Sequence, residues 1–389
     1  MVPAPPVVAV APKRGHRLWA LPMAGIGFLL LAAVVIAPTI TAARFSQIKR
    51  PYGIVPSGAE DVEPRLSFAD AKRYRADGEI LFVTIRQPQL SVLSWFMVRN
   101  ENDVRLLTNE EANGNGTSQQ QSVRGRRQMV SAKQAAEYAA LTKLGYPIKL
   151  KQGSIVVEQI VCLKVSDDGS KCDTEAPSGK VLEPDDELIS IDGTAVEALD
   201  DLQAILKGHK AGDMVEVEFN RPGKNDPQKG TIELIASPDD AQRIIIGFYP
   251  FDTTEVGAAP FDVSIDTDGI GGPSAGLAFA LTLIDELTPG ELTGGLRVAV
   301  TGTIDVEGDV GAIGGLPQKA SAVRQTGTKI FLVPAGQSDD DIAEARRVAG
   351  PGVRIIRVAT LDEALAVLVK LGGNGDKLGQ PGKDFNPVV

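Results

Sequence analysis

One serine in the 389-residue chain has a setting that suits a nucleophile. Ser274 follows Gly271-Gly272-Pro273 and precedes a largely apolar run, residues 277–284. This pattern predicts a helix that begins close to Ser274. Unpaired backbone N–H groups and the positive end of the helix dipole favour the oxyanion that forms when a serine attacks a carbonyl. A simple N-cap serine would show the same local pattern, so both roles stay open.

The histidine content excludes the usual partner of a catalytic serine. Residues 272–276 match the G-x-S-x-G nucleophile elbow, whose histidine comes after the serine. The chain has two histidines, His16 and His209, and neither follows Ser274. His209 stands between lysines in a charged stretch that is typical of a solvated turn. A histidine-dependent serine hydrolase is therefore not expected.

Lysine is the remaining candidate for the base. Lys319 follows Ser274 by 45 residues and has the apolar neighbours Leu316 and Ala320. A helix that begins near Pro317 would partly bury its ammonium group. Burial lowers the pKa of a lysine from about 10.4 toward the range of a general base. On composition alone, an exposed surface lysine is the alternative.

Several segments in a fixed order carry a family resemblance. They comprise residues 270–276, 292–295, 300–304, 311–319 and a strand-like run at 329–334. Together they resemble the proteolytic domain of the Lon family, serine peptidases with a Ser-Lys dyad, across residues 240–370. The resemblance implies that Ser274 is the nucleophile, Lys319 the general base and Thr301 the threonine that helps to orient the lysine. It also implies a ring-like homo-oligomer.

Two departures from ATP-dependent Lon limit what carries over. Those enzymes have an acidic residue three positions before the serine, where this chain has Gly271, so a regulatory carboxylate is not expected. The chain also contains no G-x-x-x-x-G-K-[ST] phosphate loop. We therefore expect cleavage without ATP, with no cofactor and no metal, and no ability to unfold stable substrates. The net charge of −10 (40 basic minus 50 acidic residues) argues against a nucleic-acid partner.

A second resemblance precedes the catalytic segments. Residues 181–193 resemble the G-x-x-x-G-D-x-I-x-x-I-D-G run of bacterial protease-associated PDZ domains, with Asp185 in place of the usual glycine. A helix is predicted at 198–207 and a strand at 214–220. A small β-domain without a ligand is the alternative. Cys162 and Cys172 flank a predicted hairpin turn, and a disulfide and two buried thiols are equally compatible with this spacing.

The N-terminal region predicts a membrane anchor. Residues 18–43 form 26 consecutive positions without a charge, and about 20 apolar residues suffice to cross a bilayer. A cleaved signal peptide is the alternative. Basic residues flank both ends of the segment, so charge alone does not orient it. Together with the PDZ-like and Lon-like parts, the anchor makes the chain similar to bacterial membrane-anchored PDZ–Lon proteases of the YlbL type. That resemblance implies catalytic and PDZ domains on the extracytoplasmic side of the cell membrane.

The expected fold is an α+β multidomain chain. Its predicted parts are a cytoplasmic tail (1–17), a transmembrane anchor (18–43), a juxtamembrane region (44–145), a PDZ-like β-rich domain (146–238), an α/β Lon proteolytic domain (239–372) and a disordered tail (373–389). Within the juxtamembrane region we expect strands at 80–85 and 90–98, a loop at 100–127 and a helix at 131–144 with Ser131 as N-cap. The region itself suggests no chemistry.

The expected function is that of an ATP-independent, single-pass membrane endopeptidase acting on polypeptides, with the PDZ-like domain recruiting or gating substrates. The alternative is a membrane-bound PDZ adaptor whose Lon-like domain is structural or only weakly active.

Overall fold

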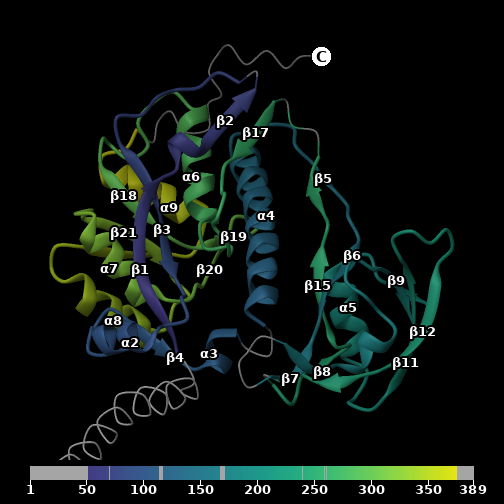
Figure 1. Cartoon of the computed structure of the whole chain (residues 1–389). Helices are drawn as coiled ribbons and strands as arrows, with labels where there is room; N and C mark the ends of the chain where they lie inside the picture. The colour runs from purple at the N-terminus through teal and green to yellow at the C-terminus, as the bar shows by residue number, and fades with distance from the viewer. Residues whose placement is uncertain are drawn as a thin grey trace, which may run out of the picture. The chain divides into compact units, whose positions relative to one another are not determined.

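A computed structural model describes residues 51–69, 71–113, 117–166, 171–238, 240–257, 259 and 261–374 (Figure 1). The predicted anchor and both predicted tails lie outside these residues, apart from 373 and 374. Within the described part of the chain, no helix has the length and apolarity needed to cross a bilayer.

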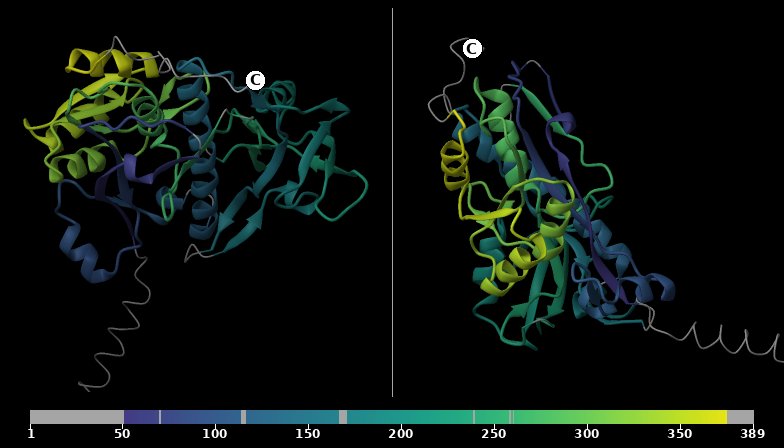
Figure 2. Two further views of the ribbon diagram at one scale, coloured as in Figure 1. Left: turned by 90° about the horizontal axis from the view of Figure 1, so that it is seen from above. Right: turned by 90° about the vertical axis from the view of Figure 1, so that its left-hand side faces the viewer.

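The central sheet draws its strands from two distant parts of the chain. Its strand order is β22-β21-β18-β3-β1-β4. Figure 1 labels these strands apart from β22, and Figure 2 shows the fold from two further sides. The strands are β1 (Tyr52–Asp61), β3 (Glu79–Arg86), β4 (Arg105–Leu107), β18 (Arg297–Val300), β21 (Ile330–Pro334) and β22 (Arg354–Val358). β3, β18, β21 and β22 run parallel to their neighbours in this series, whereas β1 is antiparallel to β3 and β4.

This pairing corrects the predicted division of the chain. Residues 44–145 were expected to form a separate juxtamembrane region, and the α/β domain was expected to begin at 239. Instead β3 pairs in register with β18, so that Phe82 faces Val300. The central sheet therefore needs the segment before residue 108, and the α/β domain is discontinuous in sequence.

Helices cover both faces of this sheet. They are α4 (Ser118–Lys143), α6 (Gly276–Leu287), α7 (Leu316–Gln325), α8 (Asp339–Ala349) and α9 (Leu361–Lys370). Ile80 and Phe82 join the core beneath α4, α6 and α9, whereas Val83 joins the core beneath α7 and α8. Because both faces are buried, β3 reads as a continuous apolar run, as parallel strands usually do.

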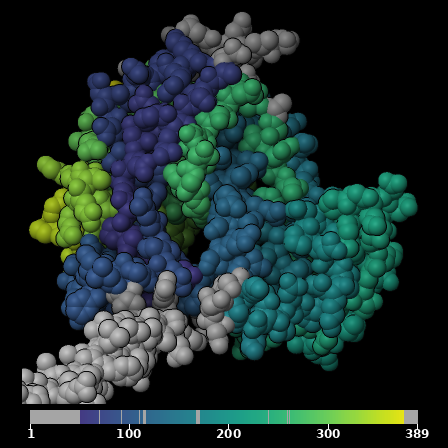
Figure 3. Space-filling model, in the orientation of Figure 1, coloured from purple at the N-terminus to yellow at the C-terminus, as the bar shows by residue number. Residues whose placement is uncertain are grey.

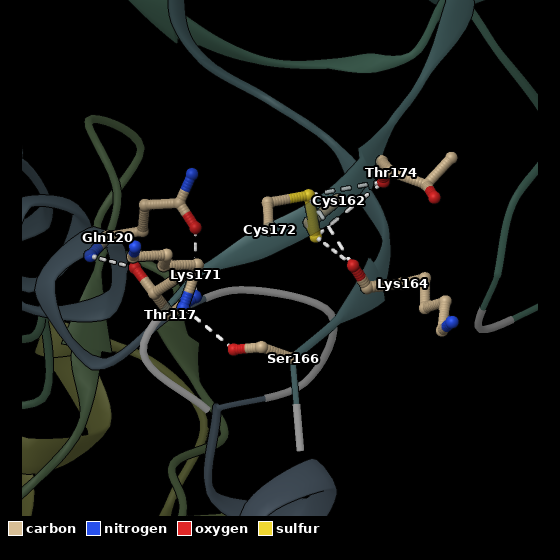
Figure 4. The surroundings of a disulfide bond; sticks show 8 residues. All are labelled: Thr117, Gln120, Cys162, Lys164, Ser166, Lys171, Cys172 and Thr174. Atoms are coloured by element: carbon tan, nitrogen blue, oxygen red, sulfur yellow. Dashed lines mark hydrogen bonds between the residues drawn. A yellow bond between two sulfur atoms is a disulfide. The ribbon is translucent and has the colours of Figure 1, made fainter. Parts of the chain in front are cut away.

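The rest of the N-terminal segment differs from the expectation. Residues 90–98 were predicted as a strand, but α2 occupies Val92–Val98, with the Ser91 side chain as its N-cap. The expected loop at 100–127 contains β4, α3 (Asn109–Asn113) and the start of α4. α4 begins 13 residues before Ser131, because Thr117 and Gln120 form a reciprocal capping box (Figure 4).

A second domain is inserted between α4 and α6. Its sheet has the order β12-β11-β9-β6-β15, with β10 paired to β9. The elements are β6 (Ile155–Ile160), η2 (Pro177–Lys180), β9 (Glu187–Ile191), β10 (Thr194–Ala195), α5 (Leu199–Leu206), β11 (Met214–Asn220), β12 (Gln228–Glu233) and β15 (Phe248–Asp252). They enclose their own apolar core. The predicted strand at 214–220 is confirmed, and α5 lies within the helix predicted at 198–207.

Short strand pairs complete the fold. β5 (Leu150–Lys151) pairs with β16 (Glu255–Val256), so the chain enters and leaves the inserted domain side by side. The other pairs are β2 (Leu66–Ala69) with β17 (Asp262–Ile265), β13 (Ile235–Ala236) with β14 (Ile244–Ile245), and β19 (Thr303–Ile304) with β20 (Val310–Gly311). A 3-10 turn, η1 (Glu63–Arg65), precedes β2.

The two cysteines form a disulfide. Cys162 and Cys172 lie on the paired strands β7 (Cys162–Val165) and β8 (Cys172–Glu175), and a bond joins their sulfur atoms (Figure 4). The Lys171 amide also donates to Ser166 Oγ at 3.0 Å across this hairpin. Of the two alternatives that the spacing left open, the structure has the bonded one.

Leu81→Ala tests whether the N-terminal strands belong to the core of the α/β domain. Leu81 is 1% exposed at the centre of the sheet, so its truncation should lower the free energy of unfolding by about 2–5 kcal/mol. The exposed Leu163 is the matched control, and Leu163→Ala should change the free energy of unfolding by less than about 0.5 kcal/mol. Denaturant titration of the full chain measures both, and an unchanged transition in Leu81→Ala would contradict the discontinuous domain.

Candidate active site

Ser274 lies just before a buried helix and does not cap it. α6 begins at Gly276 with Ala275 as its N-cap residue. The Ser274 carbonyl accepts hydrogen bonds from the Gly302 amide (2.9 Å) and from Thr301 Oγ1 (3.1 Å). The simple N-cap role is therefore wrong, and the Ser274 hydroxyl is available for another partner.

That partner is the side chain of Lys319. Gly315 adopts a left-handed conformation with φ of 69° and starts α7, which places Lys319 in the first turn. α7 packs on β1 and β3. Lys319 Nζ lies 2.9 Å from Ser274 Oγ and donates to the Val83 carbonyl at 2.6 Å. The structure thus brings together the two residues that the sequence reasoning paired across 45 positions.

The environment of Lys319 favours its neutral form. The residue is 2% exposed, and burial lowers the pKa of its amine to about 7. Burial is the only cause of this shift, and among the described residues no charged group opposes it. Because Val83 holds an N–H proton, the lone pair of the neutral amine can face the Ser274 hydroxyl. The arrangement can remove a proton from a serine near neutral pH.

Thr301 has a different contact from the expected one. The family resemblance implied that it orients the lysine, but its hydroxyl donates to the Ser274 carbonyl. Its own amide donates to the Leu332 carbonyl of β21 at 3.0 Å, and the residue is fully buried. Thr301 therefore ties the nucleophile's backbone to the sheet.

The glycine turn before Ser274 rests on α4. Gly272 has a φ of 87°, and its amide donates to the Gly125 carbonyl at 2.7 Å. A Cβ at Gly271 would lie 3.2 Å from the Gly125 carbonyl carbon, which is tighter than most real contacts. A side chain at position 271 would therefore press on the α4 backbone unless the two segments moved apart by a few tenths of an ångström. Sequence reasoning missed Gly125, because a lone glycine in a polar stretch carries no distinctive pattern.

A cavity of about 210 Å³ opens beside the Ser274 hydroxyl. Its wall includes β3 residues, the glycine turn and Met129 of α4. The polar side chains Glu60 and Arg86 lie on its rim from β1 and β3. Nothing in the sequence pointed to Met129 or to the β3 backbone, because their contribution depends on the pairing of distant strands.

The other sequence candidates lie elsewhere or are absent. His209 follows α5 in the inserted domain, where its Nδ1 is 3.0 Å from the Ile205 carbonyl. It does not line the cavity at Ser274. Among the described residues, no cluster of three or more His, Cys, Asp or Glu side chains is arranged to hold a metal.

Comparison with known proteins identifies the catalytic part. Residues 263–370 match the Lon protease (S16) C-terminal proteolytic domain, which belongs to a serine-type peptidase family. The Lon protease of Lachnoclostridium phytofermentans is 37% identical over 94 residues, covering 24% of this chain and 11% of that protein. The Lon protease of Azospirillum brasilense is 29% identical over 189 residues, covering 43% and 22%. The chain thus spans only a small part of the length of these curated relatives.

The chain also has a weak similarity to solved structures. The PDZ domain of an SdrC-like protein from Listeria monocytogenes is 21% identical, with a TM-score of 0.20, covering 26% of this chain and 92% of that one.

The match to the Lon proteolytic domain begins at residue 263 and so omits β1, β3 and α4. Of these, β3 supplies Val83 to the site and α4 supplies Gly125.

The pH dependence of cleavage tests the role of Lys319. Because only the neutral amine accepts a proton, kcat/KM should rise with pH through one ionisation near pH 7 and then level off. Lys319→Arg keeps the positive charge at every accessible pH and should abolish cleavage throughout. Initial rates on a short peptide between pH 5 and 10 measure both. A maximum near pH 6, or an active Lys319→Arg variant, would show that Lys319 is not the base.

Proposed function

We propose that the chain is a serine endopeptidase that works without ATP, with Ser274 as nucleophile and Lys319 as general base. The observation that carries this proposal is the buried Lys319 amine, 2.9 Å from Ser274 Oγ and with its pKa lowered to about 7. The family match over residues 263–370 supports the reaction class.

The reaction proceeds in two acyl-transfer steps. Neutral Lys319 takes the Ser274 proton as Oγ attacks the peptide carbonyl, and the resulting ammonium group keeps its hydrogen bond to Val83. The positive end of the α6 dipole favours the oxyanion. Lys319 then protonates the leaving amine, and the acyl-enzyme forms. Water, deprotonated by the same amine, then attacks the acyl-enzyme, and Lys319 returns the proton to Ser274 Oγ as the bond to the second product breaks. Thr301 is a positioning residue that fixes the Ser274 backbone.

The substrates are polypeptides that are already unfolded. The sequence has no phosphate-loop motif, so the described domains lack a means of coupling ATP hydrolysis to unfolding. The catalytic domain, by its likeness to Lon, assembles into a ring-like homo-oligomer.

The inserted domain acts as a PDZ-type module that gates the site through α4. Arg124 of α4 stacks on Tyr249 of β15, 3.5 Å from the ring centroid, and Arg127 forms a 2.7 Å ion pair with Asp185. Asp185 takes a left-handed conformation, with φ of 71°, where related PDZ sequences have glycine. Gly125, which holds the nucleophile turn, lies between these two arginines.

Part of this contact is incompletely paired. Arg124 Nε lies 3.9 Å from Glu158 Oε2, which is beyond hydrogen-bonding distance. Arg124 Nε and Glu158 Oε1 are buried without a hydrogen-bond partner among the described residues. A buried polar group without a hydrogen-bond partner is costly in free energy. A small shift of the inserted domain that brought Arg124 and Glu158 into hydrogen-bonding distance would therefore be favourable. Such a shift would move α4 and the Gly272 turn together.

The location is the outer side of the cell membrane, with residues 18–43 as a single-pass anchor. The apolar length of that segment supports the anchor. The Cys162–Cys172 disulfide supports an oxidising compartment for the folded domains.

Loss of activity on substitution tests the dyad. Ser274→Ala and Lys319→Ala should each abolish cleavage of casein-like unfolded protein, and the double variant should be no worse, because the two residues act as a unit. His209→Ala serves as the control and should retain full activity. A serine-directed covalent reagent should label the wild-type chain and not Ser274→Ala. An unlabelled, inactive but folded wild-type protein would favour the alternative of a PDZ adaptor.

Nucleotide independence is measured on the same substrate. Rates should be equal with ATP, without ATP and with EDTA, because neither proposed catalytic group needs a cofactor. A tenfold stimulation of the purified chain by ATP would contradict this part of the proposal.

Arg124→Ala separates gating from recruitment. A peptide too short to reach the inserted domain does not depend on recruitment, so its kcat reports only the site. If α4 transmits the position of the inserted domain, Arg124→Ala should change that kcat by about tenfold, since small misplacements of reacting groups are costly. Arg126→Ala removes the same charge from an exposed position on the same helix and should leave kcat unchanged. Equal kcat values in the two variants would contradict gating and would mean that the inserted domain only recruits substrates.

A further inference from the structure

α2 carries the most concentrated exposed apolar surface in the described part of the chain. Leu93, Phe96 and Met97 are 70%, 59% and 66% exposed. Among the described residues they are three of the eight large exposed hydrophobic side chains, and the other five lie on separate elements. Residues 90–98 contain no charge. Exposed apolar clusters of this kind mark contact with a partner or a membrane.

This helix is fixed beside the point where the described chain begins. The Leu90 amide donates to the Pro51 carbonyl at 2.8 Å, and the Gly53 amide donates to the Pro88 carbonyl at 3.1 Å. α2 starts two residues after Leu90 and contains seven residues, so it is about 10 Å long. Its exposed side chains therefore lie close to Pro51. In Figure 3 the blue part of the chain, which includes α2, forms part of the visible surface.

The distance from the anchor to Pro51 is short. Seven residues, 44–50, separate the uncharged segment 18–43 from Pro51. Seven residues span at most about 25 Å even when fully extended. If residues 18–43 cross the bilayer, Pro51 lies within about 25 Å of the end of that segment, and α2 begins beside Pro51.

We propose that α2 is an interfacial helix that lies in the headgroup region of the membrane and inserts Leu93, Phe96 and Met97 between the lipids. The proposal rests on the membrane anchor of the proposed function and is independent of the catalytic assignment. A helix of about 10 Å is too short to cross the bilayer, but it suits a position parallel to its surface.

The neighbouring residues suit a lipid interface. The Arg99 guanidinium lies 4.2 Å from the Phe96 ring centroid and 5.4 Å from that of Trp95. Aromatic rings concentrate at the headgroup level, and an arginine at the end of an apolar helix can reach lipid phosphates. A second copy of the chain is the less suitable occupant, because stable protein interfaces need about 20–30 residues a side and this cluster has three exposed side chains.

Quenching of Trp95 fluorescence by brominated lipids tests the position of α2. The chain has two tryptophans, so Trp19→Phe in the full-length protein leaves Trp95 as the sole emitter. In vesicles of phosphatidylcholine and phosphatidylglycerol, bromines near the headgroups should quench Trp95 more strongly than bromines at the bilayer centre. Replacing Leu93, Phe96 and Met97 by Gln should remove most of this quenching. Replacing the exposed Leu163 and Met214 by Gln is the matched control and should leave it intact.

A thiol-reactivity measurement keeps the proposal testable if the triple variant misfolds. The native cysteines are bonded, so Met97→Cys and Met214→Cys each add the only free thiol among the described residues. Both positions are similarly exposed, at 66% and 59%. In vesicles, the Met97→Cys thiol should react several-fold more slowly with a water-soluble maleimide than the Met214→Cys thiol. Equal reaction rates of the two thiols would overturn the proposal. If adding lipid, which lowers the density of the protein in the membrane, removed the protection of the Met97→Cys thiol, the result would overturn it in favour of a second copy of the chain.

Flotation of the vesicles separates the possible failures. A chain that does not float with vesicles would overturn the anchor and the role of α2 together. A chain that floats but shows no quenching of Trp95 would overturn the role of α2 alone. The fluorescence of Trp95 should be quenched to the same extent with and without the Ser274→Ala substitution. A failure of the catalytic assignment therefore leaves this result unaffected.

Discussion

The structure depends on keeping one amine buried without a counter-charge. The Lys319 side chain extends from the first turn of α7 toward the central strands, and its polar partners are the Val83 carbonyl and the Ser274 hydroxyl. Strands on both sides of β3 and helices on both faces exclude water from this position. A carboxylate nearby would restore the lysine charge, whereas solvent would restore its ordinary pKa. The covering of both sheet faces by helices thus serves this chemical requirement.

Sequence reasoning found the reacting side chains more easily than the fold that positions them. Ser274 and Lys319 were recognisable because a glycine-rich turn, a scarcity of histidine and an ordered set of segments all pointed to them. The role of β3 was not recognisable, because the pairing of Phe82 with Val300 joins segments 218 residues apart. Residues 90–98 were taken for a strand, since a short apolar run has no periodicity that separates strand from helix. The capping box at Thr117 lay within a polar stretch that reads as a loop.

α4 connects parts of the molecule that the sequence separates. Its apolar face packs on α6 behind the nucleophile, and its arginines meet the inserted domain. Between these contacts, Gly125 lacks a side chain, which lets the turn at Gly271 and Gly272 approach the helix backbone. A helix used on several sides has little freedom to shift at one contact without disturbing the others. This shared use is the physical basis for coupling peptide binding to catalysis in the proposed function.

The discontinuous sheet has a consequence for folding during synthesis on the ribosome. The Val83 carbonyl and the Lys319 amine are 236 residues apart in the chain. At typical rates of synthesis, roughly 10–50 s pass between the appearance of the first and of the second. During that interval the apolar strand β3 has no parallel partner, so it needs shielding from aggregation as it leaves the ribosome. The same delay is protective, because the proposed dyad does not exist until Lys319 has been made. A nascent chain therefore cannot digest itself or its neighbours.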